Sequence, residues 1–268
     1  MNTPLHTENT VTVDITNSGV ATVTLNRPDK HNAFDDSVIA ELTAAFNQVA
    51  NNPNARVMVL ASTGKSFSAG ADLAWMKRMA SYSYEENYKD AQALAEMLRV
   101  LNFMPMPTIA KVQGAAFGGA VGLVSCCDLA IASEKASFCL SEVKIGLIPA
   151  TISPYVVDAI GLRASRRYFM TAERFFANTA QSLGLVSEVV APEELDNATE
   201  QMINTLLNNS PAAVKAAKQL AFDVAHQTIN STLIDDTSER IASIRTSDEG
   251  QEGLTAFLEK RQPAWQAQ

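Results

Sequence analysis

Alternation of apolar and polar residues near the start of the chain gives way to helical spacing. Residues 11–15 and 20–25 both have period two and predict a β-hairpin. Asp35 or Asp36 can cap the helix that follows. Residues 56–61 form a continuous apolar run, as a strand buried on both faces requires. The apolar positions of the intervening helix are Ile39, Leu42, Phe46 and Val49.

Strands and helices alternate as far as about residue 190, and the remainder of the pattern is helical. A long helix is predicted over residues 84–102, followed by strands at 108–112 and 128–132. Later helices are expected to begin near Thr151, Leu162, Ala177, Pro192, Pro211, Asn230 and Asp248. We therefore expect one continuous domain of the α/β class, with a core over residues 1–195 and a helical oligomerisation region over 196–268.

The stretch from Thr108 to Gly122 predicts a strand, a tight turn and a helix whose first residues are nearly bare of side chains. Glycine lets another molecule approach the backbone, and the first amides of a helix lack internal partners and carry partial positive charge. Gly118 and Gly119 are therefore candidate donors to a phosphate, or to a carbonyl oxygen that gains charge in a reaction. Close packing of helix on strand would explain the same small residues.

A second turn of small residues, 62–73, also leads into a helix. Asp72 is interpreted there as a helix cap or loop brace rather than a catalytic acid. Glu142 is a carboxylate among apolar residues, and such an acid tends to have a raised pKa that suits proton transfer near neutral pH. A loop acid that caps backbone amides is the alternative interpretation of Glu142.

Composition narrows the classes of function. The chain has 268 residues, 47% of them hydrophobic, and a formal net charge of −8, which argues against a general nucleic-acid or membrane-surface binder. The three cysteines have no metal-type spacing and are predicted to be small buried residues, so no metal is expected. No secretory signal or membrane-spanning stretch is predicted, and we expect a soluble protein, cytoplasmic in a bacterium.

Taken together, these motifs resemble the enoyl-CoA hydratase/isomerase (crotonase) superfamily over nearly the whole chain. The matching segments, in order, are Asn26-Arg27-Pro28, Asn32-Ala33, residues 68–73, residues 114–119, the loop around Glu142 and residues 256–261. The resemblance implies repeated ββα units that form two roughly perpendicular sheets. It also implies a homotrimer or homohexamer, and a CoA thioester as the substrate, with no separate cofactor.

The same resemblance assigns roles to residues of this chain. It implies an oxyanion hole made by the backbone N–H groups of Ala71 and Gly119, with Glu142 as the acid/base. The CoA-binding residues would be Lys30, Ala33, Ala69, Ala71, Asp72, Leu73, Ala74, Gly118 and Gly119, with Phe257 and Lys260 reaching the CoA of a neighbouring subunit. Candidates for the acyl pocket are Trp75, Met76, Met79, Phe103, Ile152 and Tyr155.

One departure from the family pattern narrows the chemistry. Typical hydratases of this family carry a second glutamate after the glycine turn, where this chain has Gly122. Together with residues 71–79 and the loop 149–155, this is similar to a bacterial branch of methylglutaconyl-CoA hydratases of leucine breakdown, and to hydratases of longer carboxylated acyl-CoAs. Hydration of a branched or carboxylated α,β-unsaturated acyl-CoA by a single glutamate is therefore the hypothesis.

Two alternatives remain, and a third is excluded. A Δ3,Δ2-enoyl-CoA isomerase needs one acid/base and no water, and related lyases and dehalogenases use the same scaffold. An RNA-binding protein is the alternative of another class, which the net charge disfavours. A dinucleotide site is excluded, because the glycines of 114–122 lack the required spacing and the chain does not consist of two βαβαβ halves.

Overall fold

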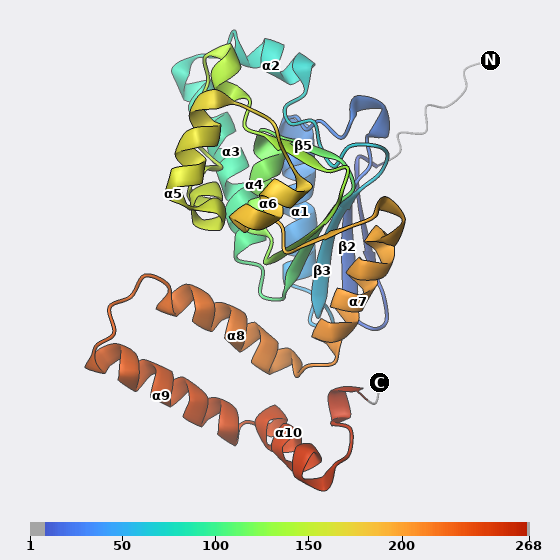
Figure 1. Cartoon of the computed structure of the whole chain (residues 1–268), viewed down its shortest axis with the longest axis vertical. Helices are drawn as coiled ribbons and strands as arrows, with labels where there is room; N and C mark the ends of the chain where they lie inside the picture. The colour runs from blue at the N-terminus through green and yellow to red at the C-terminus, as the bar shows by residue number, and fades with distance from the viewer. Residues whose placement is uncertain (1–8, 267–268) are drawn as a thin grey trace, which may run out of the picture.

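The larger of two sheets organises the fold, which the computed structural model describes for residues 9–266 (Figure 1). Its strand order is β1-β2-β3-β4-β6-β9. The strands are β1 (Val11–Ile15), β2 (Val20–Leu25), β3 (Val57–Ser62), β4 (Thr108–Val112), β6 (Leu129–Ser133) and β9 (Glu188–Val190). β1 and β2 form the predicted antiparallel hairpin, and every later pair in this sheet is parallel.

Both faces of the larger sheet are covered. Met58 and Leu60 of β3 lie in the main core, whereas Val57 belongs to a second cluster with Leu195 and Ala198 of α7. Since successive strand residues point to opposite faces, this confirms the prediction of a strand buried on both sides. The covering helices are α1 (Asp36–Ala50), α3 (Tyr84–Asn102) and α7 (Leu195–Leu207).

Local capping explains where the first helices begin. The Asp35 side chain accepts a hydrogen bond from the Val38 amide at 3.1 Å and caps α1, as predicted. Ser83 and Glu86 form a reciprocal capping box at the start of α3, which covers the predicted residues.

The smaller sheet contains three short strands in the order β5-β7-β8. These are β5 (Ala115–Phe117), β7 (Ser137–Cys139) and β8 (Phe175–Phe176). The sequence pattern predicted neither β5 nor β8, because two or three residues show no periodicity. The helices near this sheet are α2 (Leu73–Met79), α4 (Gly119–Cys126), α5 (Ser153–Thr171) and α6 (Ala177–Leu183), and Gly161, at φ 75°, interrupts α5 near the predicted helix start at Leu162.

Three C-terminal helices extend away from the sheets, as Figure 1 shows in orange and red. They are α8 (Pro211–Val224), α9 (Ser231–Thr246) and α10 (Asp248–Glu259), and the remaining short 3₁₀ segments are η1 (Pro28–Lys30), η2 (Glu142–Ile145), η3 (Pro192–Glu194) and η4 (Ala264–Gln266). α8 and α9, both wholly within the described residues, have no buried side chain. No helix among residues 9–266 is long and apolar enough to cross a membrane.

A lysine ties α8 to the core. The Lys218 ammonium donates to Asp128 Oδ2 at 2.7 Å and to the Met106 carbonyl at 3.1 Å, and its side chain is only 10% exposed. Asp128 Oδ2 also accepts hydrogen bonds from the Thr108 amide and hydroxyl. This ion pair therefore connects α8, which has no buried side chain, to the start of β4.

Replacing Lys218 with methionine is expected to lower the free energy of unfolding by about 2 kcal/mol, because a charge-assisted hydrogen bond is lost and Asp128 keeps only its bonds to Thr108. Urea denaturation at one fixed protein concentration measures the change. Lys215→Met, on the same helix and without an ion pair among the described residues, is the matched control. Equal stability of the two variants would show that the Lys218–Asp128 ion pair does not stabilise the fold.

Candidate active site

The two turns of small residues lie against each other. The Ser68 amide donates to the Ala115 carbonyl at 3.0 Å, and the Phe117 amide donates to the Ser68 carbonyl at 3.0 Å. Gly70 has φ 91°, and a Cβ there would lie 2.8 Å from the Phe117 carbonyl oxygen. Glycine is therefore required at position 70 for the backbones that precede α2 and α4 to approach each other.

Each of these turns includes a candidate backbone amide that has no protein acceptor among the described residues. Gly119 is the first residue of α4, and Ala71 precedes Asp72, the N-cap of α2. Phe34 bonds to the residues on either side of Ala71: its amide donates to the Gly70 carbonyl at 2.9 Å and its carbonyl accepts from the Asp72 amide at 3.0 Å. Within residues 9–266, neither the Ala71 nor the Gly119 amide donates to a protein group. Two such donors are what an oxyanion site requires.

Glu142 lies over the second turn. It begins η2, three residues after β7, whose last carbonyl, that of Cys139, accepts a hydrogen bond from the Gly118 amide at 2.8 Å. A Cβ on Gly118 would lie 3.4 Å from Glu142 Oε1. Oε2 is buried and has no hydrogen-bond partner within the part of the chain that the structure describes.

Burial raises the pKa of Glu142 above its usual value, and a hydrogen bond to its own backbone amide offsets this only in part. A carboxyl group in this state exchanges a proton near neutral pH more readily than an exposed glutamate. The alternative, a loop acid that caps backbone amides, does not match an oxygen left unpartnered.

An isoleucine fills the space beside Gly122. Gly118 and Gly122 are four residues apart and lie on one face at the start of α4. A Cβ at Gly122 would overlap Ile152 Cγ2, lie 2.8 Å from Ile152 Cβ and lie 3.4 Å from Leu98 Cδ2. Glu142 Oε1 therefore lies beside Gly118, and the space beside Gly122, where typical hydratases of the family carry a second glutamate, is filled by the apolar side chain of the buried Ile152.

Replacing Gly122 with alanine is expected to destabilise the protein by about 1–3 kcal/mol, because the added methyl group overpacks against Ile152. The higher helix propensity of alanine returns about 1 kcal/mol. In an Ile152→Ala background the clash with Cγ2 is absent and only the 2.8 Å approach to Cβ remains, so Gly122→Ala should then be less destabilising. Chemical denaturation of the four proteins in this cycle measures the effect, and the same loss in both backgrounds would contradict the contact.

Asp72 is a brace, as predicted. Its Oδ1 accepts hydrogen bonds from the Ala74 amide at 2.8 Å and the Trp75 amide at 3.4 Å, and its Oδ2 lies 3.4 Å from Lys30 Nζ. Burial alone would raise the pKa of Asp72, but these two amides and Lys30 lower it below its usual value. The carboxylate thus stays ionised and holds the start of α2.

Asn32 holds the loop at residues 26–34, which includes the candidate CoA residues Lys30 and Ala33. Asn32 is buried, accepts a hydrogen bond from the Arg27 amide at 2.8 Å and donates to the Thr63 and Ser66 carbonyls. This fixes the loop to the turn at 62–73. The candidate CoA residues Lys30, Ala69, Leu73 and Ala74 are exposed along this edge, whereas Ala33 is buried.

The acyl-pocket candidates occupy different environments. Trp75 is buried, and its indole N–H donates to Asp90 Oδ1 of α3 at 3.2 Å. Met76 and Tyr155 are half-buried, and Met79 packs on the core. Phe103 instead packs against Phe222 of α8, with ring centroids 5.2 Å apart.

Two further candidates lie far from these turns. Phe257 is 81% exposed on α10, and Lys260 ends that helix. Figure 1 shows α10 at the opposite end of the molecule from α2. A single chain therefore does not bring Phe257 and Lys260 to the turn residues.

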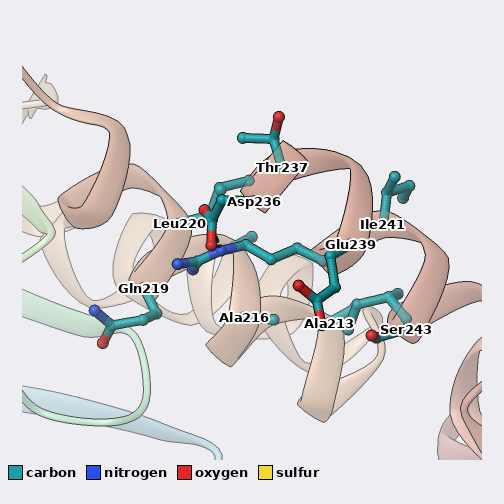
Figure 2. A pocket seen from close by; sticks show the side chains of 12 residues that line it. Ala213, Ala216, Gln219, Leu220, Asp236, Thr237, Glu239, Ile241 and Ser243 are labelled. Carbon is teal, nitrogen blue, oxygen red and sulfur yellow. Dashed lines mark hydrogen bonds and ion pairs between the residues drawn. The ribbon is translucent and has the colours of Figure 1, made fainter. Parts of the chain in front are cut away.

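A groove of about 570 Å³ lies between α8 and α9 (Figure 2). Its floor includes Ala213, Ala216 and Ile241, and Arg240 pairs with Asp223 and Asp236 beside it. None of the candidate catalytic residues lines this groove. No group of three or more metal-ligating side chains placed to hold an ion occurs among the residues that the structure describes.

Comparisons with known proteins agree with this geometry. The model of the enoyl-CoA hydratase/isomerase family matches residues 15–268. The short-chain-enoyl-CoA hydratase of Clostridium acetobutylicum is 32% identical, covering 90% of this chain and 92% of its own length. The hydroxycinnamoyl-CoA hydratase-lyase of Pseudomonas fluorescens is 33% identical, covering 78% and 76%. The crystal structure of an enoyl-CoA hydratase from Shewanella pealeana has a TM-score of 0.92 at 49% identity, with 96% of both chains covered.

Proposed function

Because the chain belongs to the enoyl-CoA hydratase/isomerase family, we propose that it adds water across the double bond of a branched or carboxylated α,β-unsaturated acyl-CoA such as methylglutaconyl-CoA. The observation that carries the proposal is that Glu142 Oε2 is buried without a partner among the described residues, while Oε1 lies beside Gly118, the residue before the Gly119 amide. Such a substrate would place the enzyme in leucine breakdown.

In the proposed mechanism the thioester carbonyl oxygen accepts hydrogen bonds from the Ala71 and Gly119 amides. Water adds its oxygen to the β-carbon and the electron pair of the double bond moves onto the thioester oxygen, where the two amides stabilise the enolate. The α-carbon then takes a proton, which Glu142 delivers, and the proton released by the attacking water restores the carboxyl group. A positioned acid/base of this kind contributes about 10²–10⁴-fold to the rate.

The position of Ile152 favours the hypothesis that the substrate carries its own carboxylate. Because Ile152 occupies the space beside Gly122, position 122 does not supply a second carboxylate to orient the attacking water there. A carboxylate on the substrate would supply the missing acceptor for the water.

We also propose that Trp75, Met76, Ile152 and Tyr155 line the acyl pocket, with Lys30, Ala33 and residues 69–74 along the CoA.

Comparison of kcat/KM for methylglutaconyl-CoA and crotonyl-CoA tests the substrate class. The proposal expects a clear preference for the carboxylated substrate, because crotonyl-CoA cannot hold the water. Equal efficiency on the two substrates would contradict it.

A Δ3,Δ2-enoyl-CoA isomerase is the second candidate, favoured by the same single carboxyl group, since isomerisation needs one acid/base and no water. Turnover in ¹⁸O-labelled water separates the two reactions. Hydration places the label in the product, whereas isomerisation leaves the product unlabelled.

We further propose that residues 1–195 form the catalytic core and that residues 196–268 assemble the chain into a homotrimer or homohexamer. Large apolar side chains on the C-terminal helices support this, because Ile234, Leu254, Phe257 and Leu258 are each at least half exposed in the single chain. In the assembly Phe257 and Lys260 would reach the CoA of a neighbouring subunit. Sedimentation equilibrium tests the assembly, and a monomer would contradict it.

A further inference from the structure

Arg27, in the loop at residues 26–34, contacts this loop and the residues that cap α1 and α2. Its side chain is 12% exposed, and Nη1 donates to the Ala33 carbonyl at 3.0 Å and to Asp35 Oδ2 at 3.2 Å. Nη2 lies 3.4 Å from Asp72 Oδ2. A planar guanidinium can serve three acceptors at fixed angles, which an ammonium group cannot do.

Both carboxylates that face Arg27 are N-caps. Asp35 uses Oδ1 to cap α1 and Asp72 uses Oδ1 to cap α2, and each turns its Oδ2 towards the guanidinium. Arg27 therefore sets the position of the start of α2 relative to the start of α1. Lys30 also approaches Asp72 Oδ2, but its side chain is 52% exposed and holds no other part of the loop in the described structure.

Phe34 links the loop that Arg27 holds to the two candidate donors, the Ala71 and Gly119 amides. It follows Ala33, whose carbonyl Arg27 holds, and its own backbone bonds to Gly70 and Asp72 on either side of Ala71. Its buried ring lies against Gly119, where a Cβ would come 2.6 Å from Phe34 Cζ. The backbone of Phe34 thus holds one amide donor and its ring supports the other.

We propose that Arg27 is a positioning residue which, through Phe34, fixes the spacing and direction of the Ala71 and Gly119 amides. This inference rests on the proposed function, since it assumes that these two amides bind the thioester oxygen. It adds that the geometry of the oxyanion site depends on a side chain that does not touch the substrate.

The test compares binding of acetoacetyl-CoA, a β-keto thioester that forms an enolate, with binding of butyryl-CoA, a saturated thioester of the same length. We expect the wild-type protein to prefer acetoacetyl-CoA. Arg27→Ala should lower this preference by about 10- to 100-fold, the loss typical of a misplaced catalytic group, and kcat should fall while binding of free CoA changes little. Arg27→Lys should restore part of the preference, because it keeps the charge without the fork.

Arg167→Ala is the matched control, because Arg167 pairs with Glu173 on the surface of α5 away from the turns, and it should keep the wild-type preference. Thermal unfolding is measured for each variant, and Arg27→Lys decides the outcome if Arg27→Ala does not fold. An unchanged preference in the folded Arg27 variants overturns the inference, as does an equal loss of affinity for acetoacetyl-CoA, butyryl-CoA and CoA. A wild-type protein without the preference would instead contradict the proposed oxyanion site.

Discussion

Replacing Glu142 with glutamine is expected to lower kcat by about 10²–10⁴-fold, the contribution of a positioned acid/base. Glutamine keeps the shape of the side chain but cannot exchange a proton with the α-carbon. Because burial raises the pKa of Glu142, the wild-type pH–rate profile should show an inflection above the usual glutamate range, and this inflection should be absent from the variant. Steady-state kinetics over a pH series measure both effects.

The same substitution is expected to raise stability at neutral pH. Below the ordinary glutamate pKa, residue 142 is protonated in the folded and unfolded states alike, so it adds no pH dependence there. Above that value the unfolded state ionises first, and wild-type stability falls until the pH passes the raised pKa of the folded state. Glu142→Gln should therefore match the wild type at low pH and exceed it at neutral pH in urea denaturation.

The exposed Glu134 provides the control, and Glu134→Gln should leave kcat unchanged. Wild-type kcat in Glu142→Gln would show that Glu142 is not the acid/base of the reaction. Lower stability of that variant at neutral pH would show that the buried carboxylate has a partner that compensates its burial.

Periodicity was sufficient to predict the elements that pack by one repeating face. The hairpin of β1 and β2, helices α1 and α3 and the C-terminal helices begin within a few residues of their predicted positions. β5 and β8 were missed, because strands of three and two residues are defined by their partners rather than by their own pattern. The paired strands of the smaller sheet come from segments far apart in the sequence, which single-sequence periodicity does not reveal.

The sequence pointed to candidate site residues but not to the contacts between them. Small residues in the stretch 108–122 indicated free amides at Gly118 and Gly119, the family resemblance pointed to the Ala71 amide, and an acid among apolar residues indicated a raised pKa. The side chain that fills the space at Gly122 could not be deduced, because Ile152 lies thirty positions further along the chain. The same holds for Arg27, which reads as an ordinary loop arginine until Asp72 and Ala33 are placed beside it.

Replacing Gly119 with proline is expected to lower kcat by about 10²–10³-fold relative to Gly119→Ala, or ~2.7–4 kcal/mol of transition-state stabilisation, because proline removes one oxyanion donor. Position 119 suits this test because it is the first residue of α4, where proline is well tolerated and its missing N–H breaks no helix bond. The added Cβ meets the Phe34 ring in both variants, so the alanine variant controls for this contact while keeping the amide. Steady-state kinetics of the two variants, with unfolding curves for each, measure the difference.

The comparison with alanine separates the amide from packing. If close packing of helix on strand were the only reason for glycine at position 119, the alanine and proline variants would lose activity together, since both place a Cβ against Phe34. If the amide binds the thioester oxygen, the proline variant alone should lose the additional factor, and its preference for an enolate-forming acyl-CoA should fall with kcat. Equal kcat in two folded variants would therefore exclude Gly119 as a donor and leave Ala71 as the only one of the two proposed amides.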